Sequence, residues 1–189
     1  RIALRALRVL EDVVKTLREM SQPVIAAING PAVGGGFCLA MATDLRIAAD
    51  TAFFRAAGIN NGLTSAELGL SYLLPRAIGI TRANDIMLTG RDIDAVEAQQ
   101  MGIVSSVTSN EQLLNASLDM AQMITRHSHV GVEQSKIMLN SSIDAGSLAG
   151  HMHHEGLTQL FVRMTTKNFE EAIKARKESR EPVFTDDLN

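Results

Sequence analysis

A glycine-rich segment, Asn29-Gly30-Pro31-Ala32-Val33-Gly34-Gly35-Gly36-Phe37, separates two apolar runs. It follows a short apolar run, 24–28, whose small and β-branched residues are typical of a fully buried strand. The glycines lead into a second apolar segment, 37–43, that we expect to be a short helix. Because glycine leaves room for close approach, the backbone N–H groups of this loop can point at a ligand, and the helix start adds its positive dipole end.

Three interpretations of the glycine loop are open at this point. The loop could cradle a phosphate group, or it could form an oxyanion hole that holds a carbonyl while it becomes an enolate. No lysine followed by serine or threonine comes after the glycines, which disfavours a P-loop. The third interpretation is a tight strand-to-helix packing turn without a ligand.

The segments on either side of the loop predict the fold class. An amphipathic helix is expected over 2–20 and a strand over 45–49, so the chain begins with the alternation α-β-α-β, which favours a layered α/β core with a parallel sheet. The later sequence is mainly helical, with one further strand at 103–107. The later predicted helices are 66–74, 76–88, 95–101, 111–126, 130–143, 148–164 and 169–180. We therefore predict a mixed core over 1–108 and a helical region over 109–189.

Composition excludes several classes of function. The chain has 189 residues, 46% of them apolar, a formal charge of −3 and one cysteine, which fits a globular fold that needs no disulfide framework. No apolar run approaches the ~20 residues that span a bilayer, and no signal segment opens the chain, so we expect neither membrane insertion nor secretion. No basic stripe with interleaved aromatics is present, which argues against nucleic acid as a partner. The lone Cys38 is compatible with a reducing cytoplasm.

A series of motifs extends the glycine loop in both directions. They are 21–30, 34–36, Asp44, 58–62, 74–79, 88–95, 98–104, 168–172 and 181–184. In this order they resemble the enoyl-CoA hydratase/isomerase, or crotonase, family over nearly the whole chain. The resemblance implies a crotonase-like spiral core of ββα turns, followed by a C-terminal helical trimerisation region. It also implies binding of a fatty acyl-CoA thioester, with no metal and no further cofactor.

The same resemblance implies where the substrate binds. In the family, two backbone N–H groups hold the thioester oxygen, and Gly35 takes the place of the second donor. The first donor and the family's early strands lie upstream of the equivalent of Ile2, so we expect them to be absent from this sequence, as an initial arginine also suggests. The implied substrate-binding residues are Gly34, Gly35, Cys38, Ala57, Gly58 and Ala66.

The chain departs from the family at both glutamates that hydratases use to activate water and to deliver a proton. Cys38 takes the place of the first and Gly58 that of the second. Glycine offers no acid, and a thiol on an apolar helix is expected to have a raised pKa and to be inert. The two-glutamate mechanism therefore cannot run here, and replacing both residues with glutamate is expected to raise hydration if the scaffold is otherwise intact.

One carboxylate remains near the predicted site. The dienoyl-CoA isomerase branch of the family carries a catalytic aspartate in the loop 62–69. Aligning back from Leu74-Pro75-Arg76 places Glu67 there, whereas aligning forward from Gly62 places Ala66 there. Glu67 is thus predicted to move a proton beside Gly35. The alternative is a capping box with Thr64, three residues earlier, that only stabilises a helix start.

Together these features predict a cytoplasmic enoyl-CoA hydratase, which is a lyase, or an enoyl-CoA isomerase of fatty acid metabolism. The resemblance implies a homotrimer or a hexamer made as a dimer of trimers. The alternative is a non-catalytic acyl-CoA-binding protein that has kept the oxyanion loop and lost its acids. Three neighbouring histidines, His151, His153 and His154, are interpreted as surface or interface residues, because metal ligation needs further ligands.

Overall fold

The structure is a computed structural model that describes residues 2–186. It divides into two compact units, Arg1–Asp119 and Met120–Asn189. The division falls inside one helix, α6 (Leu113–Thr125). The boundary predicted from the sequence, between 108 and 109, stays a prediction.

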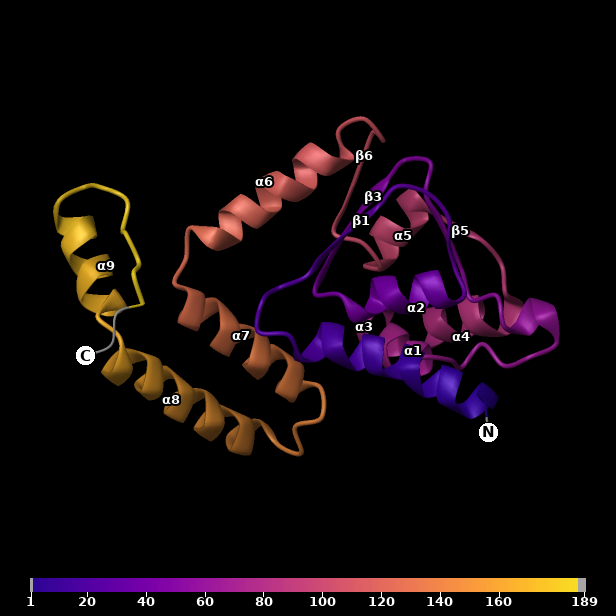
Figure 1. Cartoon of the computed structure of the whole chain (residues 1–189), viewed down its shortest axis with the longest axis horizontal. Helices are drawn as coiled ribbons and strands as arrows, with labels where there is room; N and C mark the ends of the chain where they lie inside the picture. Colours follow the sequence, from indigo (N-terminus) through magenta and orange to yellow (C-terminus); the bar gives the residue numbers. More distant parts are fainter. Residues whose placement is uncertain (1, 187–189) are drawn as a thin grey trace. The chain divides into compact units, whose positions relative to one another are not determined.

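The first unit contains two small sheets and the helices that cover them (Figure 1). In one sheet β1 (Ile25–Ile28), β3 (Leu45–Ala49) and β6 (Ser106–Thr108) lie in that order and are parallel. In the other, β2 (Ala32–Val33) pairs in parallel with β4 (Phe53–Arg55), which pairs antiparallel with β5 (Ile93–Asp94). The helical elements of this unit are α1 (Ile2–Glu19), α2 (Gly35–Ala42), the 3-10 helix η1 (Ile59–Asn61), α3 (Leu70–Ile78), α4 (Ile80–Thr89) and α5 (Ala95–Met101).

The core of this unit is built around α2. Almost every side chain of α2 is apolar, so the helix has no polar face to turn toward water, and most of its residues are buried. The rings of Phe37 on α2 and Phe54 on β4 lie 5.4 Å apart, and both side chains are fully buried. Leu70 and Leu74 of α3 join the same cluster. The position of α2 fixes the glycine loop at its start.

Several predicted elements are confirmed and others lie elsewhere. The helix over 2–20, the strand over 45–49 and the helix over 95–101 are present. The strand predicted over 103–107 begins only at Ser106, because the N–H groups of Ile103 and Val104 both donate to the Ala98 carbonyl and wrap the end of α5. The prediction that 24–28 is fully buried is wrong, since β1 is half-buried and Ala27 is exposed. Within residues 2–186, β1 pairs with β3 alone and so lies at a sheet edge.

The predicted boundary between two helices at Pro75 is also wrong. Pro75 lies inside α3, and the break comes at Gly79, whose φ of 85° reverses the chain before α4. The first of those helices was expected from residue 66, but α3 begins at Leu70. Residues 62–69 are therefore loop.

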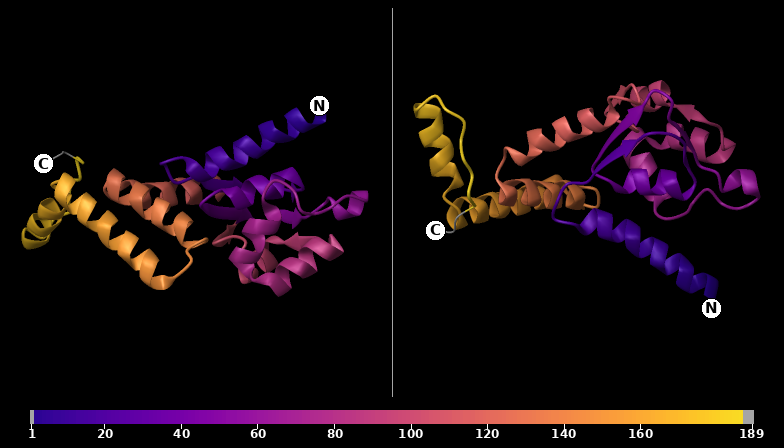
Figure 2. Two further views of the ribbon diagram at one scale, coloured as in Figure 1. Left: turned by 90° about the horizontal axis from the view of Figure 1, so that it is seen from below. Right: turned by 45° about the horizontal axis from the view of Figure 1, so that its top comes forward.

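The second unit is helical. It contains α7 (His129–Ser142), α8 (Leu148–Thr165) and α9 (Asn168–Lys177). In Figure 1 and Figure 2, α7 and α8 run side by side as a hairpin, and the Thr158 hydroxyl lies 3.6 Å from the Met138 sulfur between them. Serines cap both helices, because the N–H groups of Gly131 and Gly150 donate to the hydroxyls of Ser128 and Ser147.

The C-terminal segment is fixed to this unit by Asp186. Its carboxylate accepts hydrogen bonds from the Ser128 hydroxyl at 2.7 Å, from the His129 N–H at 2.9 Å and from the Asn168 side-chain amide at 2.7 Å. Burial alone would raise the pKa of Asp186, but these hydrogen bonds together lower it. One carboxylate thus joins the starts of α7 and α9. No described helix in either unit is long and apolar enough to cross a membrane.

Candidate functional site

The glycine loop has a backbone shape that requires glycine at one position. Gly34 has φ 53° and ψ −118°, a region that a side chain makes costly. Its N–H donates to the Arg55 carbonyl at 2.9 Å, which ties the loop to β4. The chain therefore turns sharply out of β2 and into α2.

The start of α2 presents free backbone donors. The first intrahelical bond runs from the Cys38 N–H to the Gly34 carbonyl at 3.0 Å. The N–H groups of Gly35, Gly36 and Phe37 precede it and have no acceptor within the helix. Gly34, at the cap position, has no side chain that could accept from them. Such donors, together with the positive end of the helix, can stabilise negative charge on an oxygen atom.

Cys38 lies behind this loop and is fully buried. Burial, followed by the negative charge of Glu67, raises the pKa of the thiol to about 12. Its sulfur donates to the backbone carbonyl of Glu67, with a sulfur–oxygen distance of 3.5 Å. The expectation of a raised pKa is confirmed, and the thiol is protonated at neutral pH.

Glu67 brings its side chain to the glycine loop. A Cβ atom placed on Gly34 would lie 3.5 Å from Oε1 of Glu67 and 3.9 Å from the Cβ of Ala57. Ala66, the other candidate from the alignment, is exposed. The capping-box alternative is wrong, because the Thr64 hydroxyl accepts from the Ala66 N–H at 3.0 Å and α3 starts only at Leu70.

Gly58 is closed in by backbone on the opposite side of its loop. A Cβ atom there would lie 2.0 Å from the Thr64 carbonyl oxygen, a separation that real Cβ atoms do not show. The buried Ser65 joins the two sides, since its hydroxyl donates to the Ala56 carbonyl at 3.1 Å and accepts from the Ile59 N–H at 3.3 Å. A glutamate at this position would require the loop to open first. The expectation that glutamates in place of Cys38 and Gly58 raise hydration stays a prediction.

Sequence reasoning missed Leu68, which follows Glu67 in an unusual conformation. Its φ is 43°, and the next residue, Gly69, has φ 82°. The Leu68 side chain reaches to 3.9 Å from the Cβ position of Gly35. No apolar pattern predicts a positive φ for a leucine, so the glycine that follows it was the one available signal.

The structure therefore gathers Gly34, Gly35, Cys38, Ala57 and Glu67 around one loop. Of the other predicted site residues, Gly58 is buried under Thr64 and Ala66 faces solvent. Across residues 2–186, no three His, Cys, Asp or Glu side chains lie together as ligands for a metal ion.

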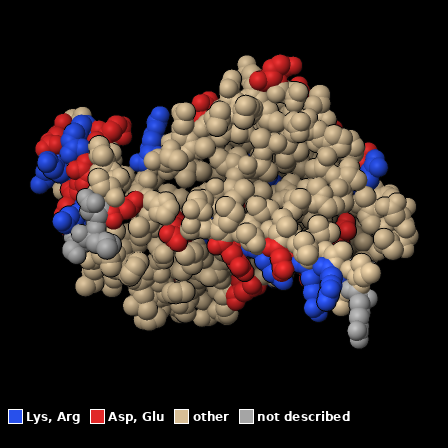
Figure 3. Space-filling view, viewed as in Figure 1, with Lys and Arg blue, Asp and Glu red and all other residues tan. Residues whose placement is uncertain are grey.

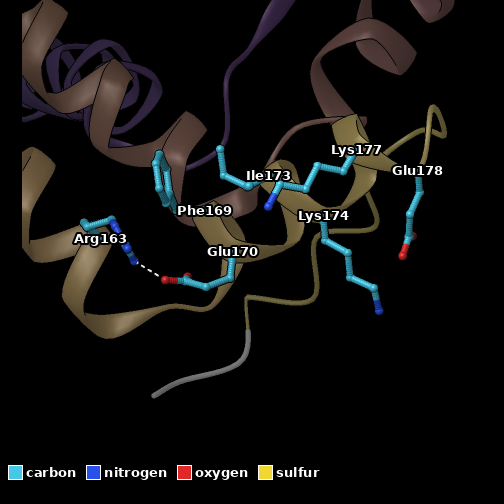
Figure 4. A pocket seen from close by; sticks show the side chains of 7 residues that line it. All are labelled: Arg163, Phe169, Glu170, Ile173, Lys174, Lys177 and Glu178. Carbon is cyan, nitrogen blue, oxygen red and sulfur yellow. Dashed lines mark hydrogen bonds and ion pairs between the residues drawn. The ribbon is translucent and has the colours of Figure 1, made fainter.

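A separate hollow of about 420 Å³ lies on the second unit (Figure 4). Arg163 lies 4.3 Å from the centre of the Phe169 ring and forms an ion pair with Glu170. Lys174 and Lys177 of α9 also line the hollow. Figure 3 shows blue and red side chains intermixed on α9, which agrees with the ion pairs that its acidic residues make.

Comparison with known proteins identifies the family. Residues 7–187 match the family model for enoyl-CoA hydratase/isomerase. A probable enoyl-CoA hydratase of Mycobacterium tuberculosis, EchA12, is 60% identical over 185 residues, which are 98% of this chain and 65% of that protein. The chain thus spans about two thirds of the length of this curated relative.

Solved structures give the same result. A probable enoyl-CoA hydratase/isomerase from Mycobacterium abscessus is 58% identical with a TM-score of 0.95, over 98% of this chain and 71% of that one. A monofunctional enoyl CoA isomerase from M. smegmatis is 57% identical with a TM-score of 0.72, over 76% of this chain and 68% of that one. This chain belongs to the enoyl-CoA hydratase/isomerase family and has its crotonase fold.

Proposed function

We propose that Glu67 moves a proton between carbon atoms of an enoyl-CoA thioester, so that the protein containing this chain is an enoyl-CoA isomerase. One observation carries the proposal. The Glu67 carboxylate lies against the glycine loop. The two positions that the family resemblance assigns to the hydratase acids hold a protonated thiol, Cys38, and a glycine, Gly58, without room for a side chain.

The reaction is a shift of one double bond. Glu67 removes a proton from C2 of a 3-enoyl thioester, and the resulting negative charge moves to the thioester oxygen. The Gly35 N–H at the start of α2 donates to that oxygen. Glu67 then returns the proton to C4, which leaves the conjugated 2-enoyl thioester. No water is consumed and the carboxylate is regenerated, so one acid–base group is sufficient.

Hydration makes a different demand on the site. It needs one group to activate water and another to protonate the α-carbon. The residues around the glycine loop support a single carboxylate in this role. The relatives carry both names, since the M. tuberculosis protein is called a probable hydratase and the M. smegmatis protein a monofunctional isomerase.

The remaining parts of the proposal follow the family. We place the acyl-CoA against Gly34, Gly35, Ala57 and Ala66, with the buried Cys38 and Gly58 behind this surface. We propose no metal and no cofactor other than the coenzyme A of the substrate. Residues 109–189 would form the trimerisation region of a homotrimer or of a dimer of trimers. The protein would act in the cytoplasm in fatty acid metabolism, without nucleic acid or membrane as a partner.

The test follows the conjugated enoyl thioester by its absorbance. The intact protein, supplied with a 3-enoyl-CoA, should produce the chromophore, and Glu67→Gln should lower kcat by roughly 10²–10⁴-fold, the usual contribution of general acid–base catalysis. Glu19→Gln, an exposed glutamate at the end of α1, serves as the control and should keep the wild-type rate.

Two outcomes contradict the proposal. If the protein consumes a 2-enoyl-CoA faster than it forms one from a 3-enoyl-CoA, it is a hydratase. Tight binding of both substrates without turnover of either would support the alternative, a non-catalytic acyl-CoA-binding protein. That alternative is favoured by the loss of acids at Cys38 and Gly58.

A further inference from the structure

We propose that Cys38 and Leu68 are positioning residues that hold Glu67 against the glycine loop. This inference rests on the proposed function, because it assigns the two residues a role through the proton-transfer group. It concerns a buried thiol and a strained leucine that the chemistry itself does not use.

The first observation is the turn that follows Glu67. The Leu70 N–H donates to the Glu67 carbonyl at 2.8 Å, which closes a four-residue turn over 67–70. Its central residues, Leu68 and Gly69, have φ 43° and 82°, and ψ of Gly69 is 2°. Two positive φ values in succession are typical of a type I′ turn, which favours glycine, asparagine or aspartate. Leucine at its first central position is strained.

The second observation is what keeps the strained turn in place. The Leu68 side chain packs against the buried core of the first unit and lies 3.9 Å from the Cβ position of Gly35. A less strained turn would withdraw this side chain from the core. Backbone strain that persists because the surroundings fix it is concentrated at functional sites. Here the strained turn sets the direction in which the Glu67 side chain leaves the backbone.

The third observation is the thiol. The Cys38 sulfur donates to the same Glu67 carbonyl at 3.5 Å, so this oxygen accepts from both the Leu70 N–H and the Cys38 thiol. Cys38 belongs to α2, whose first residue is Gly35. The helix that presents the oxyanion donor therefore also holds the backbone of the proton-transfer residue. Because the thiol is fully buried, it stays a hydrogen-bond donor at neutral pH.

The consequence is a fixed distance between donor and base. Oε1 of Glu67 lies 3.5 Å from the Cβ position of Gly34, next to the donors at the start of α2. A misplacement of ~1 Å can cost roughly 100-fold in rate, because the proton must pass between closely placed atoms. A cysteine that served only as a small core residue would leave this distance unaffected.

The experiment compares kcat and KM for 3-enoyl-CoA isomerisation by the intact protein and its variants. Cys38→Ala removes the donor, whereas Cys38→Ser keeps one. Leu68→Gly removes both the strain and the packing. Cys38→Ala and Leu68→Gly should lower kcat about 10- to 100-fold with KM within about twofold, and Cys38→Ser should recover most of the loss. Met87→Ala, which truncates another half-buried residue against the same core, should destabilise the fold without lowering kcat.

A double-mutant cycle separates positioning from general damage. In the Glu67→Gln background, Cys38→Ala and Leu68→Gly should lower kcat no further, because the group that they position is already gone. Thermal unfolding of each variant shows whether it is folded. If Leu68→Gly does not fold, the pair Cys38→Ala and Cys38→Ser decides the outcome.

The possible failures are distinct. Wild-type turnover by Glu67→Gln overturns the proposed function and this inference with it. Loss of turnover in Glu67→Gln, with unchanged kcat in Cys38→Ala and Leu68→Gly, overturns the positioning role alone. Equal losses of kcat in Cys38→Ala and Met87→Ala also overturn it, since general destabilisation would then be the cause.

Discussion

Gly58→Ala should destabilise the first unit strongly, although the backbone there suits any residue. Gly58 has φ −53° and ψ −46°, so alanine meets no dihedral strain and would by itself gain about 0.4–1 kcal/mol through the unfolded chain. The cost is purely steric. The new Cβ would lie 2.0 Å from the Thr64 carbonyl oxygen, 2.8 Å from its carbon and 3.2 Å from the Ser65 Cα. All three are backbone atoms, so no side-chain rotation relieves the contact.

The size of the effect follows from two terms. Inserting a methyl group into filled space costs typically about 1–3 kcal/mol, because side chains and backbone must shift. If the new methyl group pushes the segment 56–58 away from the segment 64–65, it also strains the two hydrogen bonds of the Ser65 hydroxyl, each worth about 0.5–1.5 kcal/mol. After the gain from the unfolded chain is subtracted, we expect a loss of about 2–4 kcal/mol in the free energy of unfolding. That loss lowers Tm by about 4–16 °C in a chain of this size.

Urea unfolding followed by circular dichroism measures this loss, with thermal unfolding as a second measurement. Gly30→Ala is the matched control in the same unit, because no atom lies within 4 Å of its Cβ position, and it should leave stability unchanged or raise it by at most about 1 kcal/mol. A Gly58→Ala variant as stable as the control would contradict the steric clash with the Thr64 backbone. The loop would then have room, and a glutamate at this position would be a practical way to introduce an acid.

Two further predictions concern ionisable groups. Burial and the charge of Glu67 raise the pKa of the Cys38 thiol to about 12, so this thiol should resist alkylation by iodoacetamide in the folded protein near neutral pH. Mass spectrometry should show that it reacts once the protein is unfolded. Alkylation of the folded protein at the rate of the unfolded protein would contradict the burial of Cys38. Hydrogen bonds from Arg180 and from the Val183 N–H lower the pKa of Glu171 from 4.5 to about 2, so the stability that they add is present above pH 4.5 and is lost as the pH falls through about 2. Glu171→Gln should therefore flatten the dependence of the urea midpoint on pH between these values. Glu181→Gln, at an exposed neighbouring glutamate, is the control and should not flatten it. Parallel curves for the wild type and Glu171→Gln would count against a stabilising role of the Glu171 hydrogen bonds.

Much of the fold could be predicted because its signals are local. The amphipathic period of α1 and the apolar run of β3 specify a helix and a strand without reference to the rest of the chain. Proline and glycine mislead where the signal depends on context. Pro75 was predicted to end a helix, but the positive φ at Gly79 ends it instead. Strands of two or three residues, such as β2 and β5, are too short to show any period.

The candidate site was predictable in its loop and unpredictable in its contacts. Three glycines before an apolar helix indicate free N–H donors. Alignment narrowed the position expected for a proton-transfer residue to Glu67 or Ala66. The closure of Gly58 against Thr64 depends on two segments meeting in space, which the sequence does not encode locally. The same is true of the bond from Cys38 to the Glu67 carbonyl, which joins residues 29 positions apart.

The carboxylate of Asp186 also has a consequence for the order of events during synthesis. It completes the start of α7 by accepting from Ser128, a residue made 58 positions earlier. At a translation rate of about 5–20 residues per second, the helix waits roughly 3–12 s for this acceptor. During that interval the first turn of α7 relies on the Ser128 hydroxyl alone, and the starts of α7 and α9 are not yet tied together. The helical unit can therefore reach its final hydrogen bonding only after residue 186 has left the ribosome.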